Sequence, residues 1–244
     1  MIGSFFAKII SYKADKIIAI SNAVKFFLSS NFVGIKRKKI KVIYYGLKSL
    51  KILNKKDNKK LIFHKNKNQI ILGCMARLVP QKSIENILRA ISILKKENIK
   101  LIIVGNGPMK SELFMLSKKL NIENKILWIN FIDDLDSFYK KIDIFVLTSK
   151  YEGLGLVFLE AMLCKKPIIA SNTSAMPEIV KHNYNGFLVK PDNPVLLSKS
   201  ILKLKKKNLR LKFGINGYNF LKKNFTVKKM YKKTQEIYLS NEKK

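Results

Sequence analysis

Apolar residues follow two alternating patterns along this chain. Short continuous apolar runs predict strands that are buried on both faces, whereas apolar residues that recur every three or four positions predict amphipathic helices. From about residue 68 onward the two patterns alternate regularly. Strands are predicted over residues 70–75, 101–104, 126–129, 142–147, 167–171 and 186–189.

Helical spacing lies between the strands. The apolar positions with that spacing include Ile84, Ile87, Leu88, Ile91 and Leu94, then Met109, Leu113, Leu116 and Leu120, then Leu135, Phe138 and Tyr139. This alternation predicts the α/β class, with one complete Rossmann-like, doubly wound parallel sheet. Motifs follow four of the strands, at Arg77, Gly105, Glu152 and Pro177. Because ligands bind beyond the carboxyl ends of such strands, these motifs are expected to share one edge of the sheet.

The ends of the chain carry fewer elements. Residues 16–21 and 40–44 predict two strands, joined by a helix with Val24, Phe27 and Leu28 on one face. The Lys- and Asn-rich segment 50–68 predicts a linker.

A closing helix is expected to begin at Thr226, whose hydroxyl suits an N-cap. The residues expected on one side of this helix are Val227, Met230, Tyr231, Thr234, Ile237 and Tyr238.

The charge of the chain is extreme, at a formal +33 from 49 basic and 16 acidic residues in 244. Such a field attracts polyanions and anionic membrane surfaces. The lysines are spread along the chain and accompany abundant Ile and Asn, which favours the compositional bias of an AT-rich genome. Contact with an anionic membrane ranks second, and binding of nucleic acid a distant third, because no basic stripe is interleaved with aromatic residues.

Cysteine and histidine suggest no separate chemistry. Cys74 and Cys164 form no Cys-x-x-Cys pair and are expected to be small apolar side chains in a reducing compartment. His64 and His182 are isolated, so neither a metal site nor a Ser–His–Asp set is predicted. No signal peptide is recognisable, and no apolar run reaches the ~20 residues that span a bilayer. We therefore expect a cytoplasmic protein, with peripheral contact to the inner face of the membrane as an option.

The candidate chemistry lies around two carboxylates eight residues apart, Glu152 and Glu160. The residues that follow Glu152 are Gly153, Leu154, Gly155 and Leu156. A strand that enters such a turn and then a helix exposes unpaired backbone N–H groups, which suit a phosphate. Carboxylates beside it suit sugar hydroxyls, so the cluster indicates a nucleotide-sugar. On these residues alone, an ordinary α/β turn flanked by solvated carboxylates is an equally open interpretation.

These residues resemble the Glu-x7-Glu signature of retaining glycosyltransferases of family 4, also called glycosyltransferase group 1. The other segments that resemble this family are residues 76–82, 104–108, 166–171, 177–180 and 185–189. The resemblance extends from about residue 14 to residue 238 and therefore covers nearly the whole chain.

The resemblance implies a GT-B-like fold, in which two Rossmann domains face each other across a cleft. Residues 1–49 would then be a truncated remnant of the N-terminal acceptor domain, and 50–68 a linker. Residues 69–225 would bind the nucleotide-sugar, and 226–244 would form a closing helix that packs back on the N-terminal remnant. The implied reaction transfers a sugar with retention, without a metal or cofactor, to an acceptor such as a cell-surface glycolipid or polysaccharide.

The resemblance also assigns roles to residues. Arg77 and Lys82 would hold the negative charge of the departing diphosphate, together with the backbone amides of the glycine turn. Glu160 would bind the ribose hydroxyls and Glu152 the transferred sugar. Asn130 and Phe131 occupy the position of a base-binding loop.

Glu178 has two open interpretations, a site residue or an acid that stabilises the start of its own helix.

Most of the family's first domain has no counterpart here, so three functions are weighed. The first is an active transferase, alone or with a partner chain that supplies the front domain. The second is a non-catalytic or truncated donor-domain remnant, against which the retention of Arg77, Lys82, Glu152 and Glu160 argues. The third is a basic nucleic-acid-binding protein.

Overall fold

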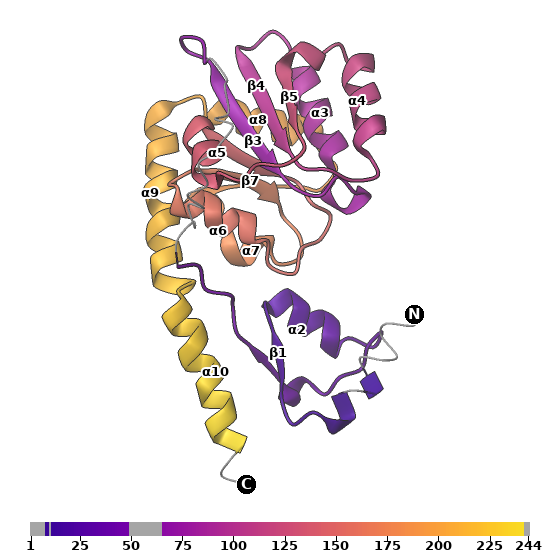
Figure 1. The fold of residues 1–244 in the computed structure, drawn as a ribbon, viewed down its shortest axis with the longest axis vertical. Coiled ribbons are helices and arrows are strands. Elements are labelled where there is room, and N and C mark those ends of the chain that lie inside the picture. The colour runs from indigo at the N-terminus through magenta and orange to yellow at the C-terminus, as the bar shows by residue number, and fades with distance from the viewer. Residues whose placement is uncertain (1–7, 10, 49–64, 242–244) are drawn as a thin grey trace.

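The computed structural model describes residues 8–9, 11–48 and 65–241. Within them the strands form two parallel sheets. The smaller sheet pairs β1 (Ile17–Ala19) with β2 (Ile40–Val42), with α2 (Asn22–Ser29) between them in the chain. We call residues 11–48 the N-terminal unit and residues 65–225 the main unit; the two occupy opposite ends of the molecule (Figure 1).

The main unit contains a six-stranded sheet in which every neighbouring pair is parallel. Its strands are β3 (Ile70–Met75), β4 (Ile99–Val104), β5 (Ile126–Ile129), β6 (Ile144–Leu147), β7 (Ile168–Ser171) and β8 (Gly186–Val189). Their order across the sheet is β5-β4-β3-β6-β7-β8. The chain therefore winds outward from β3 in one direction and then outward from β6 in the other. This arrangement confirms the α/β, doubly wound fold class and places the switch of direction between β3 and β6.

Helices cover both faces of this sheet (Figure 1). They are α3 (Ile84–Ile93), α4 (Lys110–Lys119), α5 (Leu135–Lys141), α6 (Leu156–Leu163), α7 (Met176–Ile179), α8 (Pro194–Lys203) and α9 (Lys207–Asn224). Short 3₁₀ turns lie at η1 (Arg37–Lys39), η2 (Pro80–Lys82) and η3 (Glu123–Lys125). α3 packs against α4 and α8, whereas α6 packs against α9.

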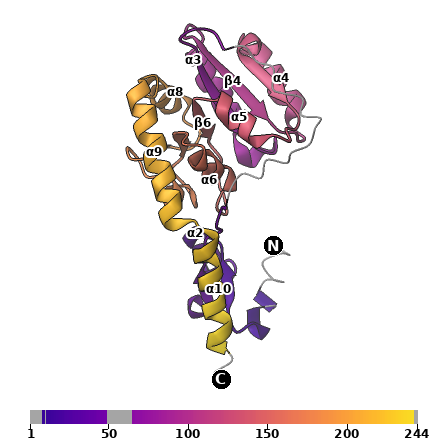
Figure 2. The ribbon, with the colours of Figure 1, turned by 60° about the vertical axis from the view of Figure 1, so that its left-hand side comes forward.

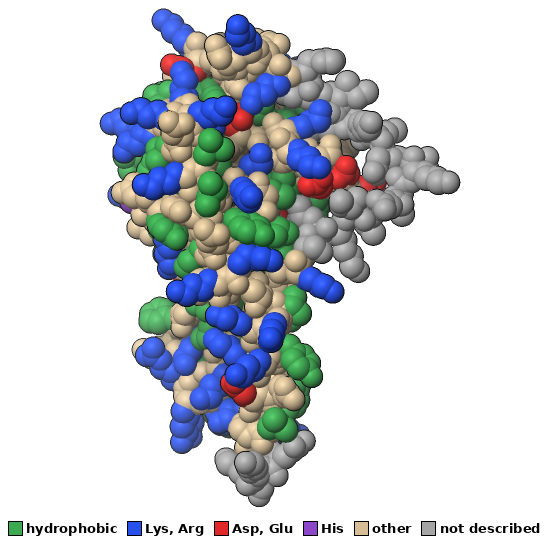
Figure 3. All heavy atoms as spheres, turned by 90° about the vertical axis from the view of Figure 1, so that its left-hand side faces the viewer, with side chains coloured by type: hydrophobic (Ala, Val, Ile, Leu, Met, Phe, Trp, Pro, Cys, Tyr) green, Lys and Arg blue, Asp and Glu red, His purple; other side chains and the backbone are tan. Residues whose placement is uncertain are grey.

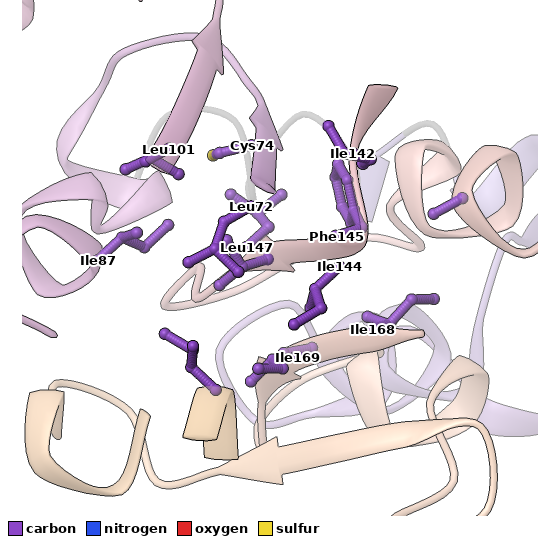
Figure 4. Packing of buried hydrophobic residues seen from close by; sticks show 14 of the residues in the cluster. Leu72, Cys74, Ile87, Leu101, Ile142, Ile144, Phe145, Leu147, Ile168 and Ile169 are labelled. Carbon is purple, nitrogen blue, oxygen red and sulfur yellow. The ribbon is translucent and has the colours of Figure 1, made fainter. Parts of the chain in front are cut away.

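The core of the main unit is continuous across the sheet. Side chains of β3, β4, β6 and β7 meet Ile87 of α3 in one apolar cluster (Figure 4). Leu72, Phe145 and Ile169, from three adjacent strands, are fully buried. Burial on both faces explains why these strands are apolar throughout rather than alternating.

Several predicted strand bounds are wrong by one or more residues: β4 begins earlier, at Ile99, β7 begins later, at Ile168, and β1 and β2 are shorter than predicted. The start of β6 also differs. The apolar run suggests residues 142–147, but β6 begins at Ile144, and the carboxylate of Asp143 makes contacts of its own. Its Oδ2 accepts a hydrogen bond from the Ile71 amide at 2.8 Å and pairs with Lys65 Nζ at 2.7 Å. The carboxylate thus accepts from a backbone donor of β3 that lies one residue before Leu72, where the pairing of β3 with β6 begins.

The N-terminal unit has its own small core of Ala19, Val33, Ile35 and Ile40. Val24 and Leu28 of α2 pack against it, as expected. The prediction that Phe27 shares their face is wrong: this side chain is 54% exposed, and its ring lies 6.1 Å from that of Phe32.

The closing helix is α10 (Val227–Asn241), and it runs beyond α9 alongside the N-terminal unit (Figure 2). Thr226 is confirmed as its N-cap, because the Lys229 amide donates to Thr226 Oγ1 at 3.2 Å. Near its start, Met230 Sδ accepts from the Gly46 amide at 3.4 Å. Farther along, Tyr231 and Tyr238 are exposed, so the predicted apolar side is only partly covered.

Lysine and arginine side chains are scattered over the face formed by α9 and α10 rather than gathered in one stripe (Figure 3). None of the helices in the described ranges is long and apolar enough to cross a membrane. The predicted linker 50–68 lies outside the described residues except for its last four positions.

Candidate functional site

The loops after β3 and β6 are joined directly at the switch of strand order. Gln81 O accepts from the Lys150 amide at 2.8 Å, and Gln81 Nε2 donates to Tyr151 O at 2.8 Å. The two strands are neighbours in the sheet, so their carboxyl ends open onto one edge. In open α/β sheets such a crevice is the preferred place for a ligand.

An ion pair joins these two loops. Lys82 Nζ lies 2.7 Å from Glu152 Oε1, with the Lys82 and Glu152 side chains only 19% and 8% exposed. Ser149 Oγ donates to the same carboxylate oxygen at 2.7 Å. The structure therefore brings together two residues that lie 70 positions apart in the sequence and fixes the carboxylate of Glu152 by two donors.

The backbone of Glu152 is held as well. Ser174, which follows β7, donates from Oγ to Glu152 O at 2.8 Å, and the Glu152 amide approaches the same Oγ at 3.4 Å. The loop after β7 thus supports the loop after β6 from its other side.

The glycine turn leads into α6 as predicted. Gly155 precedes the helix with a φ of 83°, and a Cβ there would lie 2.6 Å from the Phe158 ring. Leu154 is buried beneath the turn and Leu156 is exposed at the start of the helix. Among the described residues, the amides from Gly153 to Val157 have no hydrogen-bond acceptor. They form a row of unpaired donors at the positive end of a helix dipole.

Glu160 lies in the second turn of α6, where the Tyr139 hydroxyl approaches Glu160 Oε2 at 3.0 Å and Val157 O at 3.1 Å. Partial burial raises the pKa of the Glu160 carboxyl, while the hydrogen bond from Tyr139 lowers it in part. The fully buried Tyr139 is a partner that sequence reasoning assigned to the core alone.

We expect Glu160→Gln to unfold at a higher temperature than the wild type at neutral pH. A carboxyl whose pKa is raised on folding favours the folded state only when protonated, so its ionised form destabilises the protein. The advantage of the variant should shrink as the pH falls towards about 4, where glutamate protonates in both states. Thermal unfolding at the two pH values checks this, and an advantage that is the same at both would contradict it.

Arg77 stands in the loop after β3, exposed and without an acidic partner in the described ranges. This loop is locked to the one after β4, since the Leu78 amide donates to Asn106 O at 2.9 Å. Gly105 allows the close approach: with a φ of 147°, a Cβ there would lie 1.9 Å from Ala76 O. The two upstream motifs therefore form one compact structure at the edge of the sheet.

The remaining predicted residues lie after β5. The side chain of Phe131 is 75% exposed, and Asn130 Oδ1 accepts a hydrogen bond from Lys110 Nζ of α4. Neither contacts the Lys82–Glu152 pair through any hydrogen bond in the described part of the chain.

The predicted motifs share one edge of the sheet, as expected. They follow β3, β4, β6 and β7, which are consecutive neighbours around the switch point. Sequence reasoning did not predict the supporting contacts of Gln81, Ser149 and Ser174 with the acid and the loops. The place of Ser149, three positions before Glu152, is the one local signal that could have suggested its contact.

Glu178 does not cap its own helix. It lies in the single turn of α7, but its carboxylate accepts from the Asn22 and Ala23 amides at the start of α2. The acid therefore stabilises a helix in the N-terminal unit.

Comparison with known structures agrees with this architecture. The chain superposes on HepE of Anabaena, crystallised with UDP and glucose, with a TM-score of 0.79 and 23% identity. The match covers 93% of this chain and 63% of HepE. At this identity the likeness concerns the fold, which is that of GT-B glycosyltransferases.

Sequence comparison defines the family. The model for glycosyl transferases group 1 matches residues 55–220, so this chain belongs to that family. A glycosyltransferase of Methanocaldococcus jannaschii is 39% identical over 95% of this chain and 60% of its own length. The O-antigen biosynthesis glycosyltransferase WclY of Escherichia coli is 30% identical over 81% of this chain and 54% of its own length. The chain thus spans little more than half the length of these relatives.

Proposed function

We propose that this chain provides the donor-binding part of a retaining glycosyltransferase of family 4, which takes a sugar from a nucleotide diphosphate-sugar. The observation that carries the proposal is the Lys82–Glu152 pair at the switch point, beside the row of unpaired amides that begins α6. A cation, helix-end donors and carboxylates at one edge of the sheet match a ligand with charged phosphates and neutral hydroxyls.

The proposed reaction needs positive charge near the diphosphate, which Arg77 and Lys82 would supply. Breaking the bond between sugar and phosphate builds negative charge on the departing diphosphate. We propose that this charge is held without a metal by the guanidinium of Arg77, the ammonium of Lys82 and the amides from Gly153 to Gly155. Donors fixed before the reaction stabilise developing charge most effectively, because they need not reorganise during it.

We assign the two acids to the sugars. Glu160, anchored by Tyr139, would bind the ribose hydroxyls, and Glu152 would contact the transferred sugar. Glu152 is already held by Lys82 and Ser149, so its carboxylate is better suited to orient a hydroxyl than to act as a mobile nucleophile. Asn130 and Phe131 are proposed to face the base.

The acceptor side is proposed from the family alone. Residues 1–49 would contribute the end of an acceptor domain, 69–225 would hold the donor, and 226–244 would bridge back. An acceptor of the surface-polysaccharide or glycolipid class is consistent with the O-antigen role of WclY. Further polypeptide, whether in the same protein or in a partner chain, would complete that domain, and the basic surface would favour an anionic membrane.

We expect Arg77→Ala to weaken binding of UDP by roughly tenfold or more, because a charge-assisted, bidentate contact to phosphate is lost. Isothermal titration with UDP and a panel of UDP-sugars measures this. The matched control is Arg89→Ala, which removes an exposed arginine on α3 outside every motif. Equal affinity in Arg77→Ala and wild type would remove Arg77 from the site, and DNA affinity above nucleotide-sugar affinity would favour the nucleic-acid alternative.

A further inference from the structure

Glu178 forms the densest set of polar contacts between the two units. Its Oε2 accepts from the Asn22 amide at 2.9 Å, from Asn22 Nδ2 at 3.0 Å and from the Tyr44 hydroxyl at 2.6 Å. Its Oε1 accepts from the Ala23 amide at 2.8 Å. Asn22 Nδ2 also donates to the Tyr44 hydroxyl at 2.7 Å. One carboxylate of the main unit therefore receives four donors from the N-terminal unit.

These contacts are strong for physical reasons. Hydrogen bonds to an ionised acceptor are roughly twice as strong as neutral ones. The two amides belong to the first turn of α2, where the helix dipole also favours a negative charge. Consistent with this, the hydrogen bonds from Tyr44 and α2 lower the pKa of Glu178, outweighing the largest single influence, partial burial, which raises it. Burial and Glu178 together raise the pKa of Tyr44.

Tyr44 also connects the carboxylate to the junction between α9 and α10. Its ring meets that of Phe225 edge-on, with centroids 5.3 Å apart. The Leu47 amide donates to Phe225 O at 2.9 Å, and a Cβ on Gly46 would lie 2.3 Å from the Val227 nitrogen. The segment after β2 is thus packed tightly on the junction between α9 and α10.

The same contacts place the N-terminal unit over the glycine turn. A Cβ on Gly153 would lie 3.1 Å from Ile20 Cδ1 and 3.8 Å from Val24 Cγ2. Ile20 immediately precedes the Ser21 N-cap of α2, and Glu178 binds the first two residues of that helix. A shift of α2 away from Glu178 would therefore withdraw Ile20 from the turn whose amides are unpaired.

We propose that Glu178 is a positioning residue that holds the N-terminal unit closed over the Gly153 turn. Together with its partners Tyr44 and Asn22, we call it the latch. The latch itself is a property of the fold, and its effect on donor binding rests on the function proposed above. Glu178 acts through Ile20 and the turn and makes no contact of its own with the Lys82–Glu152 pair in the described structure.

The test measures the distance between the units directly. Spin labels are placed on Cys substituted for Lys38 in η1 and for Lys119 in α4, both exposed, in the otherwise full-length chain. Cys164 is replaced by serine, while the fully buried Cys74 stays. Double electron–electron resonance then gives the distribution of label distances without any ligand.

We expect Glu178→Gln to lower the ratio of closed to open molecules by roughly tenfold, because the loss of a charged acceptor costs about one decade in an equilibrium constant. Tyr44→Phe should shift the same distribution in the same direction, by less. The matched control, Glu112→Gln on the exposed face of α4, should leave it unchanged. Circular dichroism confirms that each variant is folded.

A distribution in Glu178→Gln and Tyr44→Phe identical to that of the wild type would overturn the latch. UDP titration of the same variants separates the two proposals. If the units open but the wild type binds no nucleotide, the latch stands and the proposed function fails. If Glu178→Gln binds UDP as tightly as the wild type although the units open, the latch exists but does not position the donor turn.

Discussion

Replacing Lys82 by methionine is expected to lower the free energy of unfolding by about 3 kcal/mol, since it leaves the buried carboxylate of Glu152 without its cation. Methionine keeps much of the apolar stem of lysine, so the loss of charge dominates over the loss of packing. The Glu152 side chain is only 8% exposed, and Ser149 alone cannot replace an ammonium at 2.7 Å. Denaturant unfolding measured through the transition midpoint gives the change.

The control for this experiment is a double-mutant cycle. Glu152→Gln removes the charge from the other side of the pair, and the double variant removes both. Because the double variant leaves no buried charge unpaired, it should be less destabilised than Lys82→Met alone. Strictly additive effects of the two substitutions would mean that the ion pair is not coupled in solution.

Under the proposed function, Lys82→Met should also lose activity. If Lys82 stabilises the departing diphosphate, turnover with an accepted donor should fall by about 100- to 1000-fold, as for other fixed donors that face developing charge. A variant that loses stability but keeps its turnover at a temperature where it is folded would leave Lys82 with a structural role only.

The second large effect is expected at Gly214, in the middle of α9. A Cβ there would lie 2.0 Å from Lys165 O, a backbone atom that cannot turn away. Gly214→Ala must therefore push α9 off the end of α6, and we expect a loss of about 3 kcal/mol, the upper end for overpacking.

Gly217 on the same helix is the matched control. Its Cβ would meet Met162 Cγ at 3.3 Å, and that side chain is flexible enough to yield. Alanine is favoured over glycine in a helix interior by up to about 1 kcal/mol, so Gly217→Ala should be neutral or mildly stabilising. Thermal unfolding of both variants decides the matter; equal melting temperatures would show that α9 shifts freely at Gly214.

The strands of the main unit follow from the sequence because most of them are short, continuous apolar runs. The bounds of β3, β5 and β8 are those predicted from apolar runs. The prediction of a strand fails where a polar residue interrupts the apolar run. Asp143 is predicted within a strand, but its carboxylate accepts a hydrogen bond from the Ile71 amide. Phe27 fails for another reason, since it lies beside, not on, the face that Val24 and Leu28 bury.

The candidate site likewise combines features that the sequence predicts with contacts that depend on the tertiary structure. Glycine turns and acids after strands are local features, so the edge of the sheet on which they lie follows from parallel topology alone. The supporting contacts of Ser174 and Gln81 carry no such signal. Ser174 binds Glu152 across 22 positions and Gln81 binds Tyr151 across 70, and both depend on how the loops fold.

By itself the sequence determined the order of strands and helices and the glycine turn before α6, because both depend on local pattern. It also determined which motifs lie at the edge of the sheet, because that follows from parallel topology. Only the tertiary structure decided that Lys82 pairs with Glu152 and that Glu178 binds α2 instead of capping α7. Such contacts join residues far apart in the chain, and their energies depend on burial and geometry that no local pattern encodes.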